Sequence, residues 1–236
     1  MSSQTPRPPE APVGLTKDSL SAQAHRYLRQ ALMSGRFQPG EKIKLKEISE
    51  ELGISQTPVR EALARLVSSG VLSQVDRRSV RVAILPPERY KEIRDLRVML
   101  EGEAAWRAAQ LARGTDIDQL EQIHNQLCNA KEAKDYLAMM SENVHFHQSL
   151  CDLADMPFLS RIVRNLWLQC GPTVNAFTAH PPCEPRETHP HLAVLQALRK
   201  RDGEKAKSSI QEDILASSNL ILSYLEERLS EEQGRD

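Results

Sequence analysis

Residues 47–63 read EISEELGISQTPVREAL and predict two short helices joined by a glycine. An apolar stripe runs along the first helix, and Gly53 supplies the left-handed residue that ends it. Ser55 or Thr57 then caps the second helix, and Pro58 in the first turn of that helix loses no hydrogen bond. This order of elements is that of a helix-turn-helix, a motif that binds DNA.

The second helix has one apolar face and one polar, basic face. Apolar residues recur with helical spacing over residues 59–67, so the opposite face stays exposed and fits a major groove. Residues 71–75 and 80–84 then alternate as strands do, which predicts a hairpin that forms a wing. Arg77 and Arg78 at its tip would reach phosphates or the neighbouring minor groove. A winged helix used for protein contacts is the alternative.

Charge is divided unevenly along the chain. Residues 1–85 hold 13 Lys and Arg against 8 Asp and Glu, a net charge of +5, whereas the remainder carries −6. A basic head on an acidic body favours double-stranded DNA as the partner of the head.

Composition excludes several classes of protein. The 236 residues are 40% apolar but hold no apolar run near the roughly 20 residues of a membrane span, and the start shows no signal-peptide pattern. We therefore expect a cytoplasmic protein with no membrane partner. The four cysteines lack CxxC spacing, which argues against a zinc finger or a disulfide framework.

The expected fold is mainly α: an N-terminal winged helix-turn-helix followed by an antiparallel bundle of about six or seven helices. Residues 1–14 hold four prolines and predict a disordered tail, residues 15–85 the DNA-binding domain, and residues 86–230 the helical domain, with the boundary at Pro86-Pro87. The prolines of Pro172–Glu187 predict a loop. Helices are expected at 19–34, 88–112, 116–133, 135–154, 157–177, 189–200 and 203–229.

Polar residues fall on the apolar stripes of the bundle. His147, His191 and Asp213 each face inward from a different expected helix. An ionised carboxylate in an apolar core costs several kcal/mol unless a positive group meets it. A metal ion would serve and so would an arginine, and a buried, hydrogen-bonded histidine is the plainer alternative. Arg97 either pairs with Glu101 on the surface or holds a carboxylate in a pocket.

Segments 34–41 and 52–63, with Leu66, resemble the GntR family of bacterial transcription regulators. Two positions depart from the family pattern: Gln56 stands where Arg is common, and Ser79 stands where Gly is common, which bears on the turn of the wing. The DNA contacts that the resemblance implies are Lys46, Ser55, Gln56, Thr57, Arg60, Asp76, Arg77 and Arg78.

Segments 96–101, 143–147 and 191–198 resemble the FCD domain of the FadR branch of this family. The resemblance implies a helical bundle whose pocket holds a metal on one Asp and three His and accepts a small organic acid. Carried over by position, the ligands are Asn143, His147, His191 and Asp213, and His189 is an alternative to His191. One carboxylate and two imidazoles remain, a set suited to a divalent ion such as zinc, nickel or manganese. Arg97 would bind the effector.

Together these features predict a ligand-responsive repressor that binds a palindromic operator as a homodimer. The sequence shows no activated nucleophile and no paired acid and base, so we do not expect this protein to be an enzyme. The alternatives are a constitutive DNA-binding dimer and a metal-dependent helical enzyme domain tethered to DNA.

Overall fold

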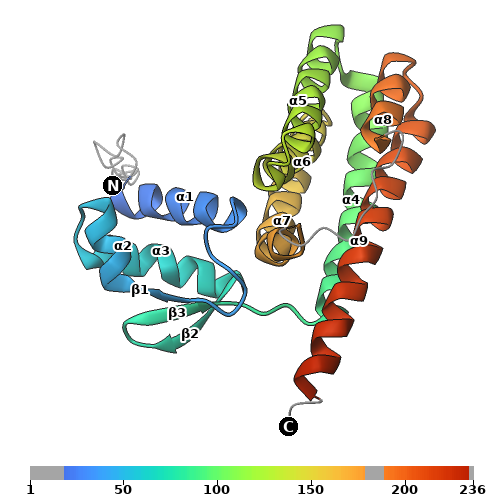
Figure 1. The fold of residues 1–236 in the computed structure, drawn as a ribbon. Helices are drawn as coiled ribbons and strands as arrows, with labels where there is room; N and C mark the ends of the chain where they lie inside the picture. Colours follow the sequence, from blue (N-terminus) through green and yellow to red (C-terminus); the bar gives the residue numbers. More distant parts are fainter. Residues whose placement is uncertain (1–18, 179–188, 234–236) are drawn as a thin grey trace, which may run out of the picture.

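The computed structural model describes residues 19–178 and 189–233. A small winged head lies beside a bundle of long helices, and one extended segment joins the two (Figure 1). The expected tail, residues 1–14, lies outside the described ranges. Within those ranges, no helix has both the length and the apolar character needed to cross a bilayer.

The head consists of three helices and a three-stranded antiparallel sheet with the strand order β1-β3-β2. As expected, Gly53 ends the first helix of the motif in the left-handed conformation (φ 64°). Ser55 occupies the N-cap of the next helix, although its hydroxyl makes no capping hydrogen bond. The elements are α1 (Leu20–Met33), β1 (Lys42–Lys44), α2 (Leu45–Leu52), α3 (Gln56–Ser68), β2 (Leu72–Asp76) and β3 (Ser79–Val82).

The predicted hairpin of the wing is present, and β1 adds a strand that was not predicted. Three residues are too few to show an alternating pattern, and two of these three are lysines. The strand exists because Ile43 pairs with Val80 across β3 and is buried in the core of the head.

Six helices form the bundle within the described ranges, as the helical spacing predicted, so the mainly α class is confirmed. Helix α4 packs along α9, α5 along α6, and α8 against α9 (Figure 1). These helices are α4 (Pro87–Leu111), α5 (Gly114–Glu132), α6 (Tyr136–Asp152), α7 (Pro157–Thr178), α8 (Pro190–Arg199) and α9 (Gly203–Gln233).

The predicted loop at Pro172–Glu187 is wrong for its first seven residues, because α7 continues through Pro172 to Thr178. An internal proline costs a helix about 3 kcal/mol. Tertiary packing offsets that cost: residues 171–176 are all buried, and Asn175 Nδ2 donates to Met33 O of α1 at 2.9 Å. The rest of the predicted loop, residues 179–187, lies outside the described ranges.

Candidate functional site

The predicted DNA-contact residues of the helix-turn-helix are all exposed. Lys46 lies on α2, where its Nζ is 3.6 Å from Glu50. Ser55, Gln56, Thr57 and Arg60 lie at the start of α3, and their side chains point away from the core of the head. This part of α3 therefore presents hydroxyl, amide and guanidinium groups to solvent.

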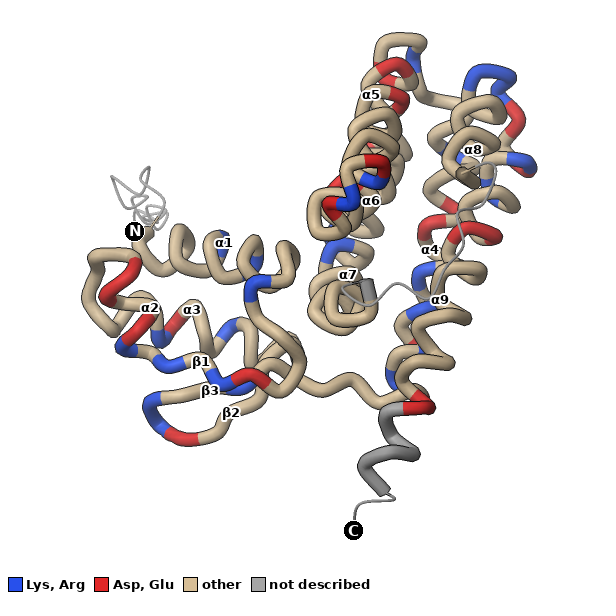
Figure 2. Tube along the Cα trace, in the orientation of Figure 1, with Lys and Arg blue, Asp and Glu red and all other residues tan. Residues whose placement is uncertain are grey.

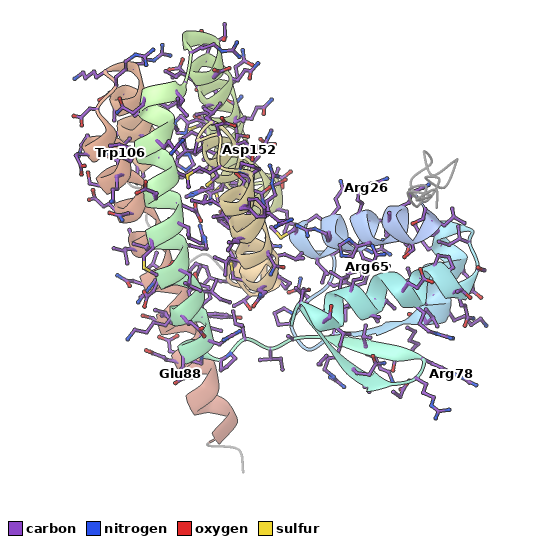
Figure 3. The ribbon with its side chains drawn as sticks, turned by 180° about the vertical axis from the view of Figure 1, so that it is seen from behind. Arg26, Arg65, Arg78, Glu88, Trp106 and Asp152 are labelled. Atoms are coloured by element: carbon purple, nitrogen blue, oxygen red, sulfur yellow. The ribbon has the colours of Figure 1, made fainter. Side chains whose placement is uncertain are left out.

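The tip of the wing is held by Asp76. Its carboxylate accepts hydrogen bonds from Arg78 N at 2.7 Å and Ser79 Oγ at 2.5 Å. These bonds, with Lys42 nearby, lower the pKa of Asp76 to about 2. Ser79 has no positive φ, so this turn does not need the glycine common in the family. Arg77 and Arg78 form a basic tip (Figure 2), and Arg78 projects away from the head (Figure 3).

Three of the predicted metal ligands meet inside the bundle. His147 of α6, His191 of α8 and Asp213 of α9 each place a ligand atom within 4.8 Å of the others. Their side chains are buried, with 1%, 0% and 8% of the residue surface exposed. Asn143, the fourth predicted ligand, is half-buried on α6 one turn before His147, and His145 is exposed on another face.

A chain of buried charges passes through this cluster. Arg97 Nε donates to Glu101 Oε1 at 2.7 Å, and Glu101 Oε2 lies 2.5 Å from His147 Nδ1. His147 Nε2 is in turn 3.0 Å from Asp213 Oδ2. The Arg97 guanidinium also stacks on Trp167, 3.5 Å from the ring centroid. Arg97 and Glu101 therefore pair as predicted, but in the interior and not on the surface.

The pKa values within this chain follow from its charges. Burial alone would lower the pKa of His147, but the attraction of Glu101 and Asp213 is stronger and the pKa is raised. Burial likewise opposes ionisation of Glu101 and Asp213, yet their cationic neighbours hold the pKa of both carboxyls below its usual range. In the metal-free protein, the protonated His147 ring thus donates to a carboxylate from each nitrogen.

His191 differs from His147 because its contact with a carboxylate is longer, with Nε2 3.6 Å from Asp213 Oδ2. Its ring stacks on Phe146 at 3.7 Å, and burial lowers its pKa to about 3 although Asp213 acts to raise it. Among the described residues, neither ring nitrogen has a hydrogen-bond partner. A neutral imidazole with unpaired nitrogens beside a carboxylate is a donor set that fits a divalent ion.

Two buried residues near the cluster were missed. Glu101 was expected on the surface, because its four-residue spacing from Arg97 also suits an exposed pair. His124 of α5 has a place on the apolar stripe with Leu120 and Leu127, a signal that would have shown it to be inward. It is 3% exposed and lies beside His189 and His191.

The metal-free chain should lose stability as the pH falls from 6 to 5. An unfolded His191 takes up a proton near pH 6.5, whereas the folded ring, with a pKa of about 3, does not. The contribution of His191 to the free energy of unfolding is complete above pH 6.5 and decreases by about 1 kcal/mol for each unit by which the pH falls below that value. His147 has the opposite sign: its contribution is complete below pH 6.5 and is lost as the pH rises through its raised pKa. Urea unfolding with EDTA at pH 6 and at pH 5 measures this change in the free energy of unfolding with pH. If His191→Leu shows the same change as the wild type, His191 is not its source.

Two surface hollows of the bundle do not lead to this cluster. One, of about 310 Å³, lies between the end of α6 and the start of α7, and one of about 340 Å³ lies between α5 and α6. Neither is lined by His147, His191 or Asp213. In this conformation the cluster belongs to the packed interior.

Both the winged head and the helical bundle match families of known proteins. The family "Bacterial regulatory proteins, gntR family" matches residues 20–82, and the family "FCD domain" matches residues 92–216. The HTH-type transcriptional regulator McbR of Escherichia coli (strain K12) is 31% identical over 209 residues, covering 87% of this chain and 93% of the relative. The HTH-type transcriptional repressor RspR of the same strain is 25% identical over 202 residues, covering 86% and 89%.

The arrangement of the elements is also shared. A solved structure titled "E. coli McbR/YncC" superposes with a TM-score of 0.82 at 29% identity, covering 87% of this chain and 98% of the other. A putative GntR transcriptional regulator from Rhodococcus sp. RHA1 superposes with a TM-score of 0.62 at 21% identity, covering 92% and 98%. At that identity the likeness concerns the fold alone.

Proposed function

Because this chain belongs to the gntR family of bacterial regulatory proteins and carries an FCD domain, we propose that it represses transcription by binding a palindromic operator as a homodimer, in response to an organic acid. It is a transcription regulator and not an enzyme. The observation that carries the effector part of the proposal is the meeting of His147, His191 and Asp213 inside the bundle. Repression is favoured by the resemblance and by the name of one relative, RspR.

DNA recognition is assigned to α3 and the wing. Arg60 and the polar residues at the start of α3 form an exposed face of the size that enters a major groove. In this proposal Arg77 and Arg78 contact phosphates or the minor groove, while Asp76 keeps the turn of the wing in shape. Basic contacts of this kind make binding salt-sensitive.

The effector site is assigned to the buried cluster. His147, His191 and Asp213, with Asn143 adjacent, would hold a divalent ion, and Glu101 would fix the orientation of His147 through Nδ1. The ion would supply positive charge for the carboxylate of an acid. Arg97 remains a candidate for a second contact to that acid, although Glu101 and Trp167 already engage it.

Helix α7 offers a physical route from this site to the head. Trp167 contacts Arg97 and lies 5.3 Å from the His147 ring, centroid to centroid. The next residue, Leu168, is part of the core of the head, and Asn175 is bonded to the end of α1. A rearrangement around His147 would therefore be passed to α1 by a helix that contacts both parts, which supports a response of the head to the effector.

We expect Zn²⁺ or Ni²⁺ together with a carboxylic acid to change the affinity of the protein for its operator. The operator is first selected from random duplex DNA, and binding is then followed by fluorescence anisotropy with acetate, lactate, malate and citrate. His147→Gln should abolish the response and keep DNA binding, because it removes a ligand far from α3. The exposed His145→Gln is the matched control. Tight operator binding that no metal and acid combination changes would favour the constitutive dimer instead.

We also expect a homodimer. One recognition helix reads only a few base pairs, and two-fold pairing matches two heads to a palindrome. Sedimentation equilibrium at micromolar concentration, with and without selected operator DNA, measures the mass of the assembly. A monomer under both conditions would refute the expectation.

A further inference from the structure

A second group of histidines adjoins the cluster described above. His124 of α5, the α8 N-cap His189 and His191 of α8 each place one ring nitrogen within 4.8 Å of the others. Their ring centroids are 4.2 Å apart for His189 and His191, and 5.3 and 5.6 Å from His124 to these two. His124 lies outside the ligand set carried over from the family, in which His189 appears only as an alternative to His191.

His189 Nδ1 and His124 Nε2 have partners, in His191 N and Cys128 Sγ, but other ring nitrogens of this group have none. Among the atoms that the structure describes, His124 Nδ1 and both nitrogens of His191 make no hydrogen bond, although these residues are only 3% and 0% exposed. Buried polar atoms are nearly always paired, because an unpaired one costs about 1 to 3 kcal/mol. Unpaired nitrogens on two adjacent buried rings therefore point to a ligand that these residues share.

Sulfur lies next to the same group. Cys128 Sγ is 3.6 Å from His124 Nε2, one turn along α5. This contact engages Nε2 and leaves Nδ1 as the unpaired nitrogen of His124.

We propose that His124, His189 and His191 form a second transition-metal site, which shares His191 with the position of His147 and Asp213. Three imidazoles suit Zn²⁺, Co²⁺, Ni²⁺ or Cu²⁺, and not Mg²⁺ or Ca²⁺. Three protein ligands leave a fourth position for water or a carboxylate. A neutral imidazole has one nitrogen with a free lone pair, so His191 serves either position, one at a time, according to its tautomer. The site stands independently of the regulatory function proposed above.

Visible absorption of Co²⁺ added to the full-length chain tests this site, because the intensity and position of the bands report nitrogen ligands in low coordination number. In His147→Gln, which removes a ligand from the first position only, we expect a Co²⁺ spectrum to remain. Adding His189→Asn should weaken that binding by more than about 10-fold. Asparagine keeps the N-cap that His189 provides for α8 while removing its imidazole. His145→Gln is the matched control.

His124→Gln, also added to His147→Gln, removes a different ligand and so tests the site even if His189→Asn disturbs α8. Circular dichroism shows whether each variant is folded. Loss of the spectrum in either folded double variant, with retention in His147→Gln/His145→Gln, supports the proposal. It is overturned if folded His147→Gln binds no Co²⁺, or if His124→Gln and His189→Asn leave the spectrum and affinity unchanged. If neither metals nor acids change the affinity for DNA, the proposed regulatory function is refuted. The Co²⁺ spectra do not depend on that result.

Discussion

Glu101→Gln should lower the free energy of unfolding by about 3 to 5 kcal/mol, the cost of leaving a buried charge without its partner. Glu101 is 0% exposed and lies between the Arg97 guanidinium and the His147 ring, with contacts of 2.7 and 2.5 Å. The His147 ring is able to lose its proton when the carboxylate is gone. Arg97 cannot, so it remains a charged group in the core beside Trp167.

Urea unfolding followed by tryptophan fluorescence measures this effect, because Trp167 contacts Arg97 directly. Glu103→Gln is the matched control, since Glu103 lies on the same helix, α4, and is exposed. We expect that control to shift stability by less than about 0.5 kcal/mol. A Glu101→Gln protein as stable as the Glu103→Gln protein would show that the buried pair does not form.

Arg60→Ala should weaken operator binding by about 1 to 3 kcal/mol at each half-site, the cost of removing one positioned contact to a base or phosphate. Since a homodimer carries the change in both heads, the total effect is up to twice as large. Arg60 is exposed, and its face of α3 is free of the packing that buries Val59 and Leu63. The fold should therefore be unaffected.

Anisotropy titrations of the selected operator at two salt concentrations measure the effect. Arg65→Ala is the control of equal charge: Arg65 lies on the same helix, but on the side that faces α1 (Figure 3). Equal losses in both variants would mean that α3 contributes only general positive charge. An unchanged affinity in a folded Arg60→Ala protein would show that α3 is not the recognition helix.

The sequence by itself determined the order and type of most elements. Helical spacing, Gly53 and the Pro86-Pro87 boundary are local signals, because they depend on the preferences of a few neighbouring residues. The same spacing placed His147, His191 and Asp213 on inward faces. Which family the chain resembles could also be read from short motifs, since these fold as local units.

Contacts between distant segments decided the rest. Strand β1 exists because β3 pairs with it, and α7 runs through Pro172 because α1 binds the residues that follow. A four-residue spacing could not tell an exposed Arg97–Glu101 pair from a buried one, since burial depends on the helices that cover it. The grouping of His124 with His189 likewise follows from the packing of α5 near α8, and so only the tertiary structure brought those rings together.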